Sequence, residues 1–125
     1  MGAWGDESYS NDGCCDALGE VIEDIYNFSQ GDANKCLKRN FDIINKQKEI
    51  ETYDKQDFLG CVVWILNQDK KVAKKYLMSA LSFAEEMLSS KEYLETWCSP
   101  SSRKYCLRKE IRILKKALKK LEDLK

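Results

Sequence analysis

The C-terminal part of the chain carries the pattern that most restricts its fold. From Pro100 onward, large apolar residues recur every three or four positions, at Leu107, Ile111, Leu114, Leu118 and Leu121. This spacing places them on one narrow stripe of an α-helix, and proline is favoured at the first helical position. Most of the stability of such a helix comes from packing its stripe against other elements. The pattern therefore predicts a helical domain.

Shorter segments upstream repeat the helical spacing. Gly31 is expected to end the first of these helices and Asp32 to cap the second, while Asp54 is expected to cap the third. Ser89 and Glu92 have the spacing of a capping box for a short helix near the C-terminus. The helices are expected over residues 13–28, from 33 onward, from 54 to 66, over 72–88, over 89–97 and from 100 onward.

Residues 58–66 are open to two interpretations. Their β-branched residues, Val62, Val63 and Ile65, are typical of a strand, but good helix formers flank them and no second strand is available for pairing. A helix is therefore favoured. With one proline in 125 residues and no internal repeat, we expect one all-α domain of five or six helices over residues 1–125. Residues 1–12 would form an irregular N-terminal segment.

The cysteines and the first residues bear on the cellular compartment. The N-terminus has neither the basic residue nor the apolar run of a secretory signal, and no stretch approaches the ~20 apolar residues of a membrane span. We therefore expect a cytoplasmic protein with no membrane contact. The six cysteines could form disulfides, but four of them fall on the expected apolar faces of helices, where free cysteine behaves as a small apolar residue, so reduced structural cysteines are favoured. Zinc is not expected, because the chain has no histidine and no Cys-x2-Cys pair.

Charge is segregated along the chain, although the net charge is zero. Residues 1–34 contain eight acidic groups and no basic one, whereas residues 103–120 contain nine basic groups and one acid, Glu110. The nine basic groups, Arg103 included, are expected on the outer face of the last helix. Each charged helix face is either an ordinary solvated surface or a binding surface for a partner of opposite charge. Four acids lie on the outward side of the first helix: Asp16, Glu20, Glu23 and Asp24.

The residues that most enzymes use are absent. Without histidine, the commonest general base and the Ser-His and Cys-His pairs are excluded. No glycine motif for phosphate or dinucleotide binding occurs, and the outward carboxylates of the first helix lack an apolar pocket that would raise their pKa. We expect no catalytic residue, no cofactor and no metal ion. For an enzyme or ligand-binding domain, the remaining candidate is a helical cleft lined by Trp64, Tyr76 and Trp97.

The first residues resemble those of a known family. Met1-Gly2-Ala3-Trp4-Gly5, Asn11-Asp12 and then Asp16-Ala17-Leu18 resemble the start of a bacterial family of small proteins of unknown function. Members begin Gly-(Ala/Thr)-Trp-Gly, continue to Asn-Asp and enter a helix of the type Asp-Ala-Leu-Asp-Trp. The likeness covers roughly the first 25 residues, and the high cysteine content and basic C-terminus depart from it. It implies a bacterial, cytoplasmic, all-α protein and no catalytic residue. Trp4 is expected to be a buried anchor, and Asn11 or Asp12 to cap the first helix.

Non-catalytic protein binding is the function that these features favour. Small size, no histidine and a one-sided acidic helix are typical of an immunity protein, an inhibitor that binds and blocks a bacterial toxin. A toxin that cuts nucleic acid is basic at its active site, so an acidic helix can cover that site as a phosphate mimic. The expected contact residues are Asp16, Glu20, Glu23 and Asp24. The alternatives are a helical enzyme or ligand-binding domain, and a nucleic-acid contact through the basic last helix, where only Tyr105 supplies an interleaved aromatic ring.

Overall fold

The computed structural model describes residues 29–49, 52–97 and 99–123, which form five helices and no strand. The predicted helix over residues 13–28, the Trp4 anchor and the cap at Asn11 or Asp12 lie outside the described residues. The all-α fold class is confirmed. The helices are α2 (Gln30–Asn45), α3 (Thr52–Asn67), α4 (Lys74–Ser89), α5 (Lys91–Glu95) and α6 (Pro100–Asp123).

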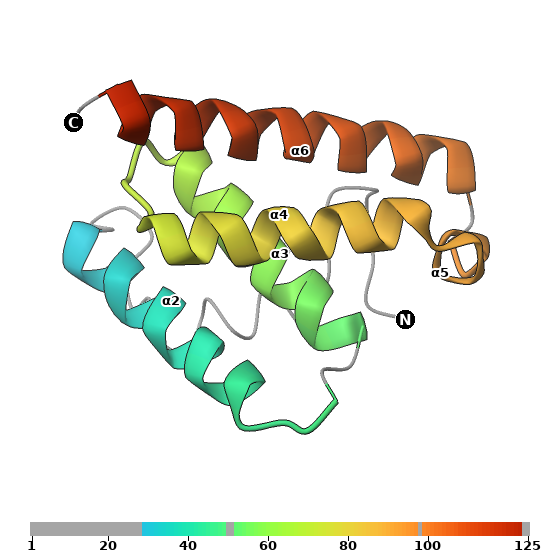
Figure 1. Cartoon of the computed structure of the whole chain (residues 1–125), viewed down its shortest axis with the longest axis horizontal. Coiled ribbons are helices and arrows are strands. Elements are labelled where there is room, and N and C mark those ends of the chain that lie inside the picture. The colour runs from blue at the N-terminus through green and yellow to red at the C-terminus, as the bar shows by residue number, and fades with distance from the viewer. Residues whose placement is uncertain (1–28, 50–51, 98, 124–125) are drawn as a thin grey trace.

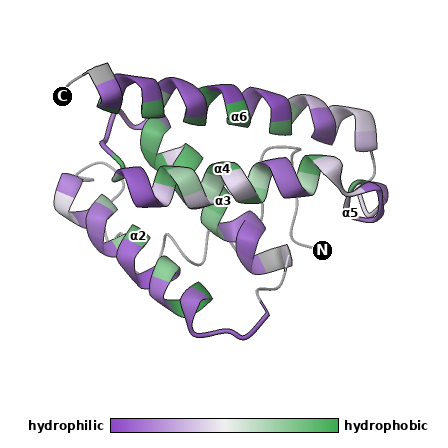
Figure 2. Cartoon of the chain, viewed as in Figure 1, coloured by the Kyte–Doolittle hydropathy of each residue, from purple (hydrophilic) through white to green (hydrophobic). Residues whose placement is uncertain are grey.

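The helices pack around α3 and α4. α4 and α6 lie side by side and run in opposite directions, because α5 and the turns around it reverse the chain between them (Figure 1). α3 packs against α4, and α2 packs against α3. Figure 2 shows hydrophilic residues over most of α6, with apolar residues along the side that faces α4. The stripe predicted from the sequence is therefore the packing seam of α6, with Leu107 and Leu114 fully buried.

α3 is buried on nearly all sides. It contacts α2, α4 and α6, and a helix so enclosed needs apolar residues around its whole circumference. This explains why residues 58–66 read as a continuous apolar run, and it confirms the helical interpretation over the strand. Six apolar side chains of α3 are at most 1% exposed: Phe58, Leu59, Cys61, Val62, Val63 and Ile65.

Aromatic rings of α2, α3 and α4 contact one another. Phe41 of α2 meets Tyr76 of α4 edge-on, with ring centroids 5.1 Å apart, and Phe58 of α3 lies 6.1 Å from Phe83 of α4. Such tilted and edge-on pairs are the favoured geometry of aromatic contacts. They fix how α2 and α4 approach the central helix.

The described cysteines are buried thiols, as the sequence predicts. Cys36 of α2, Cys61 of α3 and Cys106 of α6 all lie in the interior. A hydrogen bond from the Cys61 side chain lowers the pKa of Cys36, and it joins α2 to α3. Both thiols are fully buried, and they pack in the core as small side chains.

The start of α2 corrects two predictions. Ser29, not Asp32, is the N-cap residue, and Gly31 lies inside the helix rather than ending the preceding one. The Ser29 hydroxyl accepts a hydrogen bond from the Asp32 backbone N–H at 3.1 Å, and the Asp32 carboxylate accepts one from the Ser29 N–H at 3.2 Å. This reciprocal capping box satisfies two backbone donors, so the helix starts before the glycine.

Other helix ends lie within two residues of their predicted positions. α3 begins at Thr52, and Asp54 lies in its first turn, where it accepts a hydrogen bond of 2.9 Å from Gln47. α5 is capped by Ser90, whose hydroxyl accepts from the Tyr93 N–H, rather than by Ser89. The predicted start of α6 at Pro100 is confirmed. These shifts leave the order of the helices unchanged.

Candidate functional site

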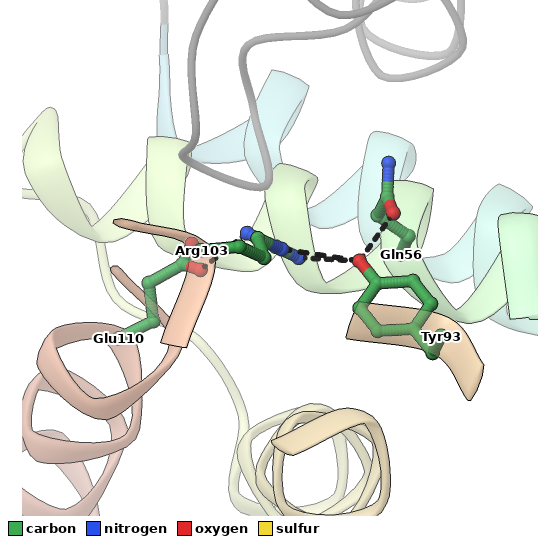
Figure 3. Close-up of polar contacts among 4 residues, drawn as sticks. All are labelled: Gln56, Tyr93, Arg103 and Glu110. Atoms are coloured by element: carbon green, nitrogen blue, oxygen red, sulfur yellow. Dashed lines mark hydrogen bonds and ion pairs between the residues drawn. The ribbon is translucent and has the colours of Figure 1, made fainter. Parts of the chain in front are cut away.

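Charged residues lie on both the inner and the outer side of α6. On the inner side, the Arg103 side chain is fully buried and the Glu110 side chain is 2% exposed. Figure 3 shows Arg103 placed between Glu110, on the same helix, and Tyr93 of α5, which in turn meets Gln56 of α3. Four residues from three helices thus form one buried polar network.

Hydrogen bonds define the geometry of this network. The Arg103 Nε and Nη2 groups donate to the Tyr93 hydroxyl at 3.1 and 2.9 Å, and that hydroxyl donates to Gln56 Oε1 at 2.5 Å. On its other side, Arg103 Nη1 lies 3.4 Å from Glu110 Oε1. The Trp97 ring lies under the guanidinium, with Cζ 4.6 Å from the ring centroid. Arg103 therefore combines an ion pair, hydrogen bonds and a cation–π contact.

The protonation state of Tyr93 fits its place in the network. Burial raises the pKa of Tyr93 above its ordinary value of 10.0, although the nearby Arg103 charge acts in the opposite direction. The phenol is therefore protonated at neutral pH and serves as a hydrogen-bond donor to Gln56. No buried side-chain nitrogen or oxygen in the described part of the chain lacks a hydrogen-bond partner. The network joins α3, α5 and α6.

Arg103 corrects a prediction from the sequence. It was expected on the basic outer face of the last helix, but it lies on the inner face with Glu110. Arg103, Leu107, Glu110 and Leu114 follow one another at intervals of four, three and four residues, so both charged residues continue the apolar stripe. Extending that stripe backward from Leu107 could have revealed Arg103, and the place of Glu110 between Leu107 and Leu114 could have revealed Glu110.

The outer side of α6 carries basic residues with no acid among them. We call this surface the basic face. None of its cations makes an ion pair with any residue in the part of the chain that the structure describes. Tyr105 lies among them and is 64% exposed. Over residues 104–120 the face extends for ~24 Å at the helical rise per residue. Its eight cations, all exposed, are Lys104, Arg108, Lys109, Arg112, Lys115, Lys116, Lys119 and Lys120.

One edge of the basic face borders a groove between α4 and α6. We call it the α4–α6 groove, and its volume is about 490 Å³. α4 contributes Glu85, Leu88 and Ser89. α6 contributes three cations and one apolar residue, namely Arg108, Arg112, Lys115 and Ile111. The groove therefore combines an apolar part with positive charge along one wall and a single acid on the other.

The structure separates the aromatic residues of the candidate ligand cleft. Tyr76 lies at the start of α4, in the aromatic cluster with Phe41. Trp97 follows α5, beyond the other end of α4, and packs on Arg103. Trp64 is half-buried and packs against the core. These residues do not line a common cleft. Among the described residues, no group of three or more histidine, cysteine or carboxylate side chains is placed to hold a metal ion.

The four acids predicted to contact a partner, Asp16, Glu20, Glu23 and Asp24, lie outside the described residues. None of the helices that the structure describes has both the length and the apolar character needed to cross a membrane. Comparisons with protein families, with curated proteins and with solved structures find no match for this chain. The family resemblance of the first residues therefore stays a prediction.

Proposed function

We propose that this chain is a non-catalytic protein-binding domain. The observation that carries the proposal is the unpaired basic face of α6, where eight exposed cations stand without an ion-paired acid in the described chain. If these charges served solubility alone, cations and anions could be intermixed on the surface. A surface of one sign instead steers association with a partner of opposite sign and selects against partners of like sign.

The more specific form of the proposal is an immunity protein that inhibits a bacterial toxin. It rests on the opposite charge at the other end of the chain, where residues 1–34 hold eight acids and no base. A nuclease toxin presents cations where it binds the phosphate backbone. Asp16, Glu20, Glu23 and Asp24 would pair with those cations and cover the catalytic site.

Co-expression with the product of the adjacent gene tests this function. We expect the chain to restore growth of cells that produce that product and to co-elute with it in size-exclusion chromatography. The Asp16→Lys/Glu20→Lys/Glu23→Lys variant is expected to lose both effects. A matched control, Asp42→Lys/Glu49→Lys/Glu122→Lys, makes the same charge change at exposed acids of the described region and should keep both. Equal behaviour of the two variants would refute the acidic contact.

A further inference from the structure

We propose that the α4–α6 groove is a second binding site, which takes an acidic and partly apolar segment of a protein partner. This inference rests on the proposed protein-binding function but uses a different surface from the acidic N-terminal residues. The groove offers about 490 Å³ between two helices. The occupant has to match both its charge and its apolar part.

The charge of the groove selects a partner segment rich in carboxylates. Arg108, Arg112 and Lys115 line the α6 wall, and the other cations of the basic face continue from it. Arginine binds carboxylates with two parallel hydrogen bonds, which gives both strength and orientation. Arg112 Nε donates to the Arg108 carbonyl at 3.5 Å, so this contact directs the Arg112 side chain back along its own helix.

The opposite wall leaves these cations available. Glu85 lines the same groove, yet it makes no ion pair with any cation of the described residues. The charged groups on the two walls are therefore not neutralised across the groove. An acidic segment would lie nearer the α6 wall, because Glu85 repels it from the α4 wall.

The apolar part of the groove favours a peptide over a nucleic acid. Leu88 is half-buried, so it presents apolar surface that a leucine of a bound segment can cover, and Ile111, which is 8% exposed, adds a small part. A phosphodiester backbone has no group to place there. Binding of single-stranded nucleic acid also relies on aromatic rings for stacking, and the exposed Tyr105 does not line the groove. A protein segment uses the whole groove, whereas a nucleic acid would use only its charge.

Fluorescence anisotropy with the full chain tests this site. The probe is a labelled peptide of glutamate and leucine, about 16 residues long to match the ~24 Å of the basic face in helical form. A second peptide has serine in place of leucine. We expect the leucine peptide to bind at least about tenfold more tightly than the serine peptide, since each buried leucine contributes that much. Duplex and single-stranded DNA of similar length complete the set.

Two triple variants of α6 locate the binding. Arg108→Glu/Arg112→Glu/Lys115→Glu reverses the groove wall and is expected to weaken binding of the leucine peptide by at least about tenfold. Lys109→Glu/Lys116→Glu/Lys120→Glu makes the same charge change on the same helix outside the groove. A loss below about threefold is expected, because these side chains do not line the groove and act on the peptide only over distances at which salt screens them. Circular dichroism checks that both variants remain helical.

Three results would overturn the groove site: equal losses in the two variants, tighter binding of DNA than of the leucine peptide, or no binding of any probe. Equal losses or preferred DNA binding would mark the basic face as a general polyanion surface. The proposed function has a separate test, because it fails only if the wild-type chain forms no complex with the product of the adjacent gene. The groove proposal can therefore fail while that complex forms.

Discussion

Arg103 and Arg112 lie on the same helix, yet they occupy opposite environments. Arg103 is fully buried, with an ion pair to Glu110 and hydrogen bonds to Tyr93. Arg112 is exposed and makes no ion pair within the described chain. The comparison teaches that the basic residues of α6 have two roles. One of them holds the fold together, and the others are left for solvent or a partner.

The largest effect is expected from Arg103→Met, which keeps much of the side-chain volume and removes the charge. Glu110 would lose its Arg103 ion pair while it remains buried. Removing one member of a buried pair destabilises a protein by about 3–5 kcal/mol. Urea unfolding followed by circular dichroism measures this. A loss below about 1 kcal/mol would contradict the buried environment of Arg103.

The double variant Arg103→Met/Glu110→Leu tests whether the two residues act as a pair. It removes both charges, so no buried carboxylate is left without its partner. We expect a loss in the free energy of unfolding that is smaller than that of Arg103→Met by at least about 1 kcal/mol, because apolar replacement of a whole buried pair is often tolerated. Simple addition of the two single-variant losses would show that the residues do not act as a pair.

Tyr93→Phe tests the other side of Arg103. The phenylalanine ring keeps the packing, but the hydroxyl that accepts from Arg103 and donates to Gln56 is lost. The expected decrease in unfolding free energy is about 1–3 kcal/mol, the cost of leaving buried polar groups without a partner. The same urea titration measures it, with Tyr105→Phe as the exposed control. Equal losses for the two variants would contradict the buried role of the hydroxyl.

The raised pKa of Tyr93 predicts a dependence of stability on pH. Because the native phenol ionises at higher pH than the unfolded one, the unfolded chain loses its proton first as pH rises above the ordinary value of 10.0. The Tyr93 contribution is therefore complete below that pH and decreases above it. Urea unfolding between about pH 8 and pH 11 should show a smaller decrease for Tyr93→Phe than for the wild type. Identical profiles would mean that Tyr93 does not titrate differently in the native state.

The smallest effect is expected from Arg112→Met on the basic face. Exposed charges without close partners contribute little to the folded state, so a change within about 0.5 kcal/mol is expected. The same substitution thus separates the two environments on α6, since Arg103→Met is predicted to be several times more damaging. A comparable loss for Arg112→Met would show that the outer cations also support the fold.

Much of the fold could be predicted from local pattern. The stripe from Leu107 to Leu121 and the start at Pro100 identify α6, because helical periodicity depends only on neighbouring residues. The first residue of a helix is harder to predict than the helix itself. Ser29 shows this, because serine and aspartate at nearby positions offer competing caps. The acids predicted to contact a partner lie outside the described residues. The structure describes only the surface of opposite charge, the basic face of α6.

The all-α class, the amphipathic last helix and the unequal distribution of charge can all be predicted from the amino-acid sequence. Each of these follows from residue types and from spacing within a single helix. The buried network around Arg103 required the tertiary structure, because Tyr93 and Trp97, which contact its guanidinium, lie outside α6. The α4–α6 groove likewise exists only once two antiparallel helices are packed together. Spacing along α6 places Arg103 and Glu110 on its inner stripe, but which elements meet around them depends on contacts between residues far apart in the sequence.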